Sequence, residues 1–181
     1  MKKLSENQKE FVKTLVMLIS IVLIFFTLNH TVFLLTNTPS ESMLDTLQVG
    51  DKVYGNRLAY LKEEPKRGEI IIFHPPDEPE KFYIKRLIGL PGEKVVIDDA
   101  KIYINDSEVP LEEDYLYEEW TEDNDDMEYQ VPEGCYFMLG DNRNDSWDAR
   151  FWENTYVERD ALVARAECVY FPFNHWKDLK E

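Results

Sequence analysis

The apolar residues of this chain follow one pattern near the N-terminus and another after residue 68. Residues 11–28 are almost all apolar, so a helix there is apolar on every side and not along one face. From residue 68 onward, apolar residues come in short runs rich in β-branched and aromatic side chains, bounded by Gly, Pro, Asn or Asp. The first pattern predicts one apolar helix, and the second predicts short strands.

The apolar helix has the length of a membrane span. From Phe11 to Leu28 it rises roughly 27 Å, against a hydrocarbon core of roughly 30 Å. A cleaved signal peptide needs a shorter apolar stretch and a small-residue cleavage site, and Asn29-His30-Thr31 has no Ala-x-Ala pattern. A buried core helix is normally amphipathic. We therefore expect a retained anchor in the lipid bilayer, over residues 11–31.

Positive charge orients this anchor. The cytoplasmic flanks of membrane helices carry an excess of basic residues, and four lysines come before or early in the helix. We therefore expect residues 1–10 to be a short cytoplasmic segment and residues 32–181 to be an extracytoplasmic domain. The four lysines are Lys2, Lys3, Lys9 and Lys13.

The pattern after the anchor predicts a mainly β fold. Turn signals such as Leu90-Pro91-Gly92-Glu93 and Asn105-Asp106 separate the strand-like runs. Short strands at this spacing predict antiparallel sheets, and 181 residues suffice for one sizeable domain with a small appendage. The predicted strands are Gly68–Phe73, Phe82–Ile88, Lys94–Ile97, Lys101–Ile104, Gly134–Leu139 and Ala161–Ala166.

The charge of the chain excludes one class of partner. With 20 basic and 36 acidic side chains the net charge is -16, so we expect no binding to nucleic acid. Ten of the 17 residues from 112 to 128 are acidic, which predicts a solvated loop between the halves of the domain. A calcium site at residues 123–126 is the alternative, but the turn glycine and closing glutamate of a calcium loop are not at the required offsets.

The histidines and cysteines give no metal site. His30, His74 and His175 lie outside any Gly- or Ser-rich motif, and neither they nor a His–Cys set have the spacing of ligands. We expect no metal and no other cofactor, and the usual Ser-His-Asp triad is excluded. Cys135 and Cys168 fall in or beside predicted strands, where a disulfide is permitted but two buried free thiols are slightly favoured.

A serine and a lysine are the candidate catalytic residues. A serine hydroxyl needs an adjacent base to become a good nucleophile, and lysine is a base only while its amine is neutral. Ser42 is the candidate nucleophile and Lys85 the candidate base. The Ser42 backbone N–H and the Ser40 hydroxyl are candidate donors to the oxyanion.

The lysine must lose its proton near neutral pH. Lowering its pKa from about 10.4 by two to three units takes roughly 3–4 kcal/mol of desolvation. Lys85 and Arg86 point to opposite faces of a strand, so one can lie among apolar neighbours while the other pairs with a carboxylate or stays in water. The local sequence therefore permits the required desolvation.

Four segments in this order resemble type I signal peptidases, the membrane-bound Ser-Lys proteases that remove signal peptides from exported proteins. The resemblance extends from the anchor to about Pro172 and implies the family's antiparallel β fold behind one transmembrane helix. The segments are Pro39–Leu47, Gly68–Phe73, Tyr83–Glu93 and Gly140–Arg150.

The resemblance implies a role for each matching residue. Ser42 is implied to be the nucleophile, Lys85 the general base, and Ser40 with Ser42 the oxyanion hole. The substrate, a preprotein signal peptide, is implied to bind as an added strand with small residues such as Ala at the first and third positions before the cut. Ser146 is implied to hydrogen-bond the lysine amine, and Asp148 with Arg150 to form a supporting ion pair, with Asp141 as a further supporting residue. We expect Met43, Tyr83 and Ile84 to form the walls of the substrate pockets.

The chain also departs from the family's pattern. Asp45 stands where proline is usual, and smaller departures occur at Glu69, Ala149 and Glu153-Asn154. Two other functions stay open: a specialised peptidase for substrates such as a pilin or matrix protein, and a non-catalytic membrane-anchored β module. Self-cleaving repressors share a Ser-Lys site but carry a DNA-binding domain and lack an anchor.

Overall fold

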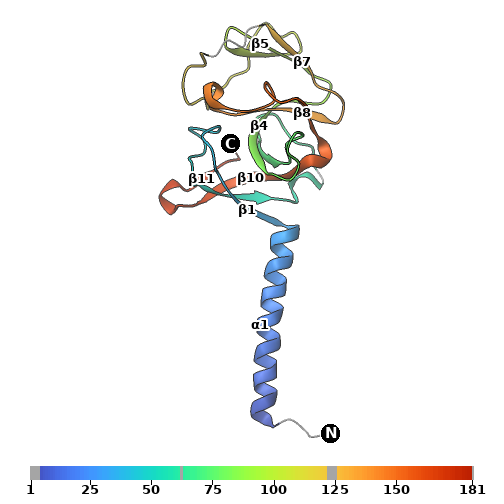
Figure 1. Ribbon diagram of the computed structural model, residues 1–181, viewed down its shortest axis with the longest axis vertical. Helices are drawn as coiled ribbons and strands as arrows, with labels where there is room; N and C mark the ends of the chain where they lie inside the picture. The colour runs from blue at the N-terminus through green and yellow to red at the C-terminus, as the bar shows by residue number, and fades with distance from the viewer. Residues whose placement is uncertain (1–4, 62, 122–125, 181) are drawn as a thin grey trace.

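The computed structural model describes residues 5–61, 63–121 and 126–180, and shows a β body on a helical stalk (Figure 1). The stalk is α1 (Glu6–Thr31), which begins about one turn before the predicted apolar span. The Ser5 hydroxyl accepts from the Gln8 backbone N–H and the Gln8 side chain accepts from the Ser5 N–H, so a capping box stabilises this polar first turn.

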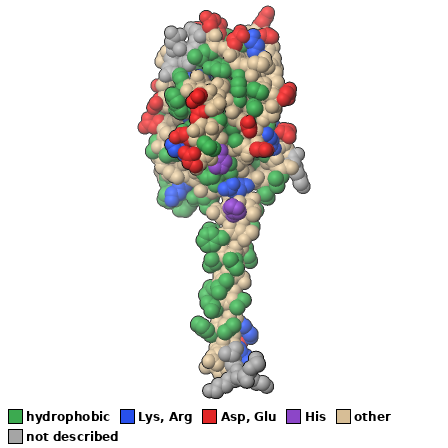
Figure 2. All heavy atoms as spheres, turned by 45° about the vertical axis from the view of Figure 1, so that its right-hand side comes forward, with side chains coloured by type: hydrophobic (Ala, Val, Ile, Leu, Met, Phe, Trp, Pro, Cys, Tyr) green, Lys and Arg blue, Asp and Glu red, His purple; other side chains and the backbone are tan. Residues whose placement is uncertain are grey.

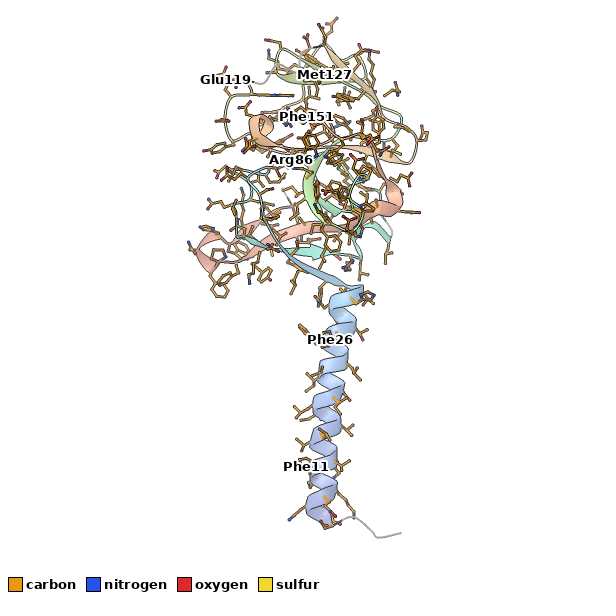
Figure 3. All side chains as sticks on the ribbon, viewed as in Figure 1. Phe11, Phe26, Arg86, Glu119, Met127 and Phe151 are labelled. Atoms are coloured by element: carbon orange, nitrogen blue, oxygen red, sulfur yellow. The ribbon has the colours of Figure 1, made fainter. Side chains whose placement is uncertain are left out.

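The stalk exposes its apolar side chains along its whole length. None of its described residues is buried, and its length and composition are sufficient to cross a membrane. At about 1.5 Å per residue its 26 residues rise about 39 Å. Figure 2 shows hydrophobic side chains along the stalk and acidic ones spread over the body, and Figure 3 shows Phe11 and Phe26 near opposite ends of the stalk.

The body is mainly antiparallel β structure, as predicted. A large curled sheet has the strand order β1-β2-β10-β3-β4-β8-β9, with β11 paired to β10, and a small sheet has the order β6-β5-β7. All six predicted strands are present: β3 (Ile70–Phe73), β4 (Tyr83–Gly89), β5 (Lys94–Asp98), β6 (Lys101–Ile104), β8 (Cys135–Leu139) and β10 (Leu162–Phe171). The pattern missed β1 (Phe33–Asn37), β2 (Lys52–Asn56), β7 (Met127–Gln130), β9 (Val157–Glu158) and β11 (Lys177–Asp178).

Two hydrophobic clusters meet at β4. Leu87 and Ile88 of this strand belong to the cluster between the large and small sheets. Ile84 belongs to the second cluster, which lies over β1, β2, β3 and β10 and also takes in Met43 and Leu47 from the loop after β1. Burying a side chain of this size stabilises the fold by about 1.5–3 kcal/mol. The loop after β1 is therefore packed into the core.

The acidic segment is less solvated than its charge predicts. Residues 112–121 form a loop, but the Glu113 side chain is only 7% exposed and pairs with Arg143, and Trp120 is buried in the core. Tyr115 packs over the Arg86 guanidinium, 3.8 Å from the ring centroid. A carboxylate with so little exposure requires a cationic partner, and Arg143 supplies it to Glu113. Most of the candidate calcium residues, 123–125, lie outside the described residues.

Both cysteines are free thiols, as favoured, but neither is fully buried as that interpretation expected. Cys135 in β8 and Cys168 in β10 are half-buried, and burial raises the pKa of each thiol. In the described part of the chain, no group of three or more His, Cys, Asp or Glu side chains is placed to hold a metal ion.

Candidate active site

Ser42 lies in the loop between β1 and β2, and buried side chains that follow it hold this loop. Met43 is 1% exposed and Leu47 is fully buried. The Leu47 backbone N–H donates to the Met43 carbonyl over 2.7 Å, and the Thr46 hydroxyl donates to Asp141 over 2.6 Å. Asp45, where the family has proline, is exposed, and the peptide bond before it is cis.

Lys85 comes from β4 and is buried beside the loop that carries Ser42. Its side chain points into the site, where its amine donates to the Ser146 hydroxyl over 3.0 Å. Lys85 is only 3% exposed, and this burial lowers the pKa of its amine to about 8. The negative charge of Asp148 opposes the shift, and the positive charge of Arg150 adds to it. The ammonium form of Lys85 thus loses its proton more readily than that of a lysine in water, and the neutral amine is accessible near neutral pH.

Arg86, the next residue, pairs with a carboxylate. Its Nε donates to Asp141 Oδ1 over 2.8 Å and its Nη2 donates to Asp141 Oδ2 over 2.6 Å, a bidentate arrangement between two buried groups. Because Asp141 also accepts from Thr46, this ion pair joins β4 to the loop that carries Ser42. Lys85 thus faces the cavity while Arg86 pairs with a carboxylate, as the alternation of side chains along a strand predicts.

A second buried ion pair lies behind Lys85. Arg150 Nε donates to Asp148 Oδ1 over 2.8 Å, and both side chains are inaccessible to solvent. Burial opposes the ionisation of Asp148, but the hydrogen bond and charge of Arg150 outweigh it and hold the pKa of this carboxyl below its usual range. The Gly140 N–H also donates to Asp148 over 3.0 Å. Asp148 therefore ties the end of β8 to the segment that presents Ser146.

Gly140 occupies the point where these segments touch. A Cβ at this position would lie 2.1 Å from Ser146 Oγ and 2.4 Å from the Ser42 carbonyl oxygen. The same carbonyl accepts from the Asn142 N–H over 3.1 Å. The absence of a side chain at Gly140 thus lets the serine of the β1–β2 loop approach the hydrogen-bond partner of Lys85.

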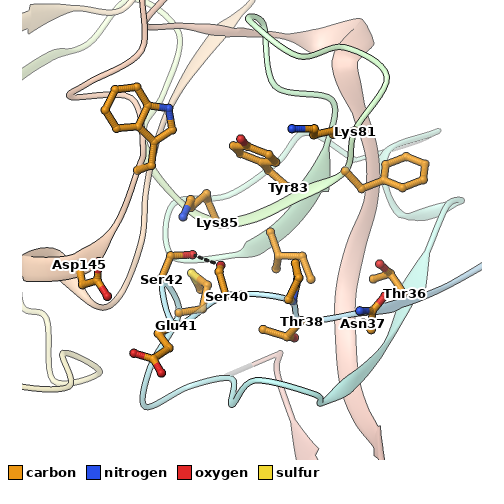
Figure 4. Close-up of a pocket in the computed structure, with 15 residues that line it drawn as sticks. Thr36, Asn37, Thr38, Ser40, Glu41, Ser42, Lys81, Tyr83, Lys85 and Asp145 are labelled. Carbon is orange, nitrogen blue, oxygen red and sulfur yellow. Dashed lines mark hydrogen bonds between the residues drawn. The ribbon is translucent and has the colours of Figure 1, made fainter.

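Ser42 and Lys85 open onto a cavity of about 660 Å³. Figure 4 shows the Lys85 amine directed toward Ser42, and the Ser40 and Ser42 hydroxyl oxygens are 3.3 Å apart. Residues Met43, Tyr83 and Ile84, which the sequence assigns to the substrate pockets, also line it. The predicted site residues are therefore brought together, with Asp141, Ser146, Asp148 and Arg150 forming the hydrogen-bonded layer behind the cavity.

One edge of β4 is open beside this cavity. Tyr83, Ile84 and Lys85 pair with β3 on one side, whereas in the described residues β8 joins β4 only from Arg86 onward. An open strand edge offers unpaired backbone groups to an extended peptide. The arrangement can therefore bind a peptide chain next to a serine hydroxyl and a buried amine.

Comparison with known proteins matches this arrangement to a family. A model of the family described as "Signal peptidase, peptidase S26" matches residues 8–171. The chain belongs to this family. It is therefore a membrane serine endopeptidase that removes signal peptides, and the resemblance inferred from the sequence is confirmed.

Two individual sequence relatives of this S26 peptidase agree with the family assignment. Signal peptidase I of Leptolyngbya laminosa is 38% identical over 152 residues, which cover 78% of this chain and 70% of the relative. Signal peptidase I T of Bacillus subtilis is 34% identical over 188 residues, with coverages of 99% and 93%. A crystal structure of a signal peptidase I from Enterococcus faecalis is 36% identical, covers 57% of this chain and 97% of its own, and superposes with a TM-score of 0.48.

Several residues around the site of this S26 peptidase were not found from the sequence. Thr46 and Gly140 lie inside the recognised segments, but only their contacts with Asp141 and Ser146 show what they do. Tyr115 belongs to the acidic segment, where the surrounding charge predicted solvent exposure. Trp147 could have been singled out from the sequence, because a tryptophan next to Ser146 in a polar segment is unusual.

Proposed function

We propose that Ser42 and Lys85 are the catalytic pair of this enzyme. The observation that carries the proposal is the buried Lys85 amine, with a pKa lowered to about 8, in the same cavity as Ser42. Neutral Lys85 takes the proton of the Ser42 hydroxyl while the oxygen attacks the carbonyl carbon of the scissile peptide bond. Ser146 orients the amine through its hydrogen bond.

The attack forms a tetrahedral intermediate, which collapses to an acyl-enzyme that water then hydrolyses. The Ser42 N–H and the Ser40 hydroxyl donate to the oxyanion, as their place beside the nucleophile permits. The C–N bond breaks, and protonated Lys85 returns its proton to the leaving amine, which leaves the signal peptide as an ester on Ser42. Lys85 next takes a proton from a water molecule, whose oxygen attacks the ester carbonyl carbon. The bond between this carbon and Ser42 Oγ then breaks, protonated Lys85 returns its proton to Ser42 Oγ, and the signal peptide leaves with a free carboxyl group.

We propose that the substrate binds as an extended strand along the open edge of β4, with small residues at the first and third positions before the cut. Met43, Ile84 and Tyr83 line the cavity at this edge, and we infer that they form the walls of the pockets for these small side chains. A preprotein with an Ala-x-Ala site is therefore expected to be cut after the second Ala by the purified enzyme in detergent. Changing that Ala to Phe is expected to lower kcat/KM roughly 10- to 100-fold through overpacking of the pocket.

The cut site is mapped by mass spectrometry of the products. A matched change of the middle residue of Ala-x-Ala to Phe serves as the control, because successive side chains of an extended chain point to opposite faces. Equal cleavage with Phe or Ala directly before the cut would refute the small-pocket assignment.

We also propose that α1 spans the bilayer, with residues 1–10 in the cytoplasm and the β body outside. β1 begins two residues after α1 ends, so the loop that carries Ser42 starts close to the membrane. Protease added outside intact spheroplasts is expected to degrade the β body and to spare an epitope tag on the N-terminus. Protection of the β body together with loss of the tag would show that the orientation is the opposite one.

A further inference from the structure

An exposed aromatic pair lies at the catalytic cavity and has no part in the proposed proton transfers. Trp147 lines the cavity and is 61% exposed. Its ring stacks on that of Phe151, with the centroids 5.7 Å apart and the planes 16° from parallel. A large aromatic surface left in water beside an active site is available to a substrate.

This pair lies next to the buried residues behind the cavity. Trp147 lies between Ser146, which binds Lys85, and Asp148, which is paired with Arg150. The Arg150 guanidinium also packs over the Phe151 ring, 4.9 Å from its centroid. The aromatic surface is therefore positioned by the same groups that position the catalytic lysine.

The pair lies on the side of the site where the cleaved chain leaves. In Figure 4, Thr36 and Asn37 lie at one end of the cavity and Glu41 and Asp145 toward the other, with Ser42 and Lys85 between them. Figure 3 shows Phe151 farther than Arg86 from α1. In the proposed function, the apolar part of the signal peptide stays in the bilayer, on the side of α1. The residues after the cut therefore extend away from α1 and pass the end of the cavity where Glu41 and Asp145 lie.

We propose that Trp147, with Asp145 and Glu41, forms a subsite for the first residues of the mature protein and favours lysine or arginine there. This inference rests on the proposed function, which sets the direction of the substrate. A cationic side chain is attracted to the face of a tryptophan ring, and both carboxylates add to this attraction while repelling an acidic side chain. Glu41 and Asp145 are both exposed, so they are free to meet an incoming substrate.

The test uses three preproteins that differ only in the first two residues after the cut: Lys-Lys, Gln-Gln or Glu-Glu. The full-length enzyme in detergent is expected to cleave the lysine substrate with a kcat/KM about 10-fold above that of the glutamine substrate, and the glutamate substrate more slowly than either. In the Trp147→Ala variant this lysine-to-glutamine ratio is expected to fall to about 2. Asp145→Lys is expected to bring the ratio below 1 through charge repulsion.

Trp176→Ala is the matched control, because Trp176 is also exposed, at 65%, but does not line the cavity. Its lysine-to-glutamine ratio is expected to equal that of the wild-type enzyme. Equal cleavage of all three substrates by the wild type, or an unchanged ratio in both Trp147→Ala and Asp145→Lys, would overturn the subsite while leaving the proposed function intact. Failure of the wild type to cleave any of the three would overturn both.

Discussion

Replacing Lys85 with methionine is expected to lower kcat/KM for preprotein cleavage by about 10⁴-fold or more while the protein stays folded. Without the amine, the Ser42 hydroxyl keeps the Ser40 hydroxyl as a neighbour at 3.3 Å, which is not a base, and a serine hydroxyl is a weak nucleophile while protonated. Methionine has a similar length and no charge, so it suits a site that is only 3% exposed. The measurements are kcat/KM and the thermal unfolding midpoint.

The thermal unfolding midpoint distinguishes an enzyme that has lost its base from one that has lost its fold. Burying an ammonium group costs free energy, and this cost is what lowers the pKa of Lys85. The methionine variant is therefore expected to unfold at the same temperature as the wild type or above it. Ser42→Ala is the matched variant that removes the nucleophile, and the double variant is expected to be no slower than either single one, because the two residues act as a unit.

The pH profile reports the same group in the wild-type enzyme. With a folded pKa of about 8, roughly one molecule in ten carries the neutral amine at pH 7 and roughly nine in ten at pH 9. Since the neutral form is the base, activity is expected to rise with pH through about 8 and then level off. A flat profile between about pH 5 and pH 9, or wild-type cleavage by Lys85→Met, would refute Lys85 as the base.

The fold was predictable where packing leaves a local pattern. β3 is fully buried, and its run of four apolar residues identifies it without any tertiary information. β2 has no such run, since only Val53 and Gly55 are buried and its place between β1 and β10 depends on distant partners. β7 does alternate, with Met127 and Tyr129 half-buried and Glu128 exposed, but the charge of the surrounding segment concealed the alternation.

The site was predictable in its residues and in some of its contacts. The resemblance implied the hydrogen bond from Lys85 to Ser146 and the ion pair of Asp148 with Arg150, and both are present. The partner of Arg86 was expected only as an unspecified carboxylate, and it is Asp141, 55 positions away. Sequence spacing carries no information about such long-range approaches. The burial of Glu113 also escaped prediction, because it depends on Arg143, 30 positions further on. Contacts that lie outside the recognised segments, such as that of Glu113 with Arg143, therefore had to come from the structure.

Replacing Gly140 with alanine is expected to lower kcat/KM by about 10²–10³-fold and to destabilise the fold by about 1–3 kcal/mol. The new Cβ would lie 2.1 Å from Ser146 Oγ and 2.4 Å from the Ser42 carbonyl oxygen, so both must move. Gly140 cannot yield easily, because its N–H donates to Asp148 and its carbonyl accepts from Arg143. The displacement therefore separates the nucleophile and the lysine from their working positions.

The matched control for this substitution is Gly55→Ala in β2. A Cβ at Gly55 would lie 2.7 Å from Ile72 Cδ1 and 3.0 Å from Ala164 Cβ, so it also overpacks the fold, but Gly55 does not line the cavity. Both variants are expected to unfold at a lower temperature than the wild type. At a temperature where both remain folded, Gly55→Ala is expected to keep its kcat and Gly140→Ala to lose it. A Gly140→Ala enzyme with undiminished kcat would show that catalysis does not require the close approach of Ser42 to Ser146, because the crowding at this glycine is what couples the two serines.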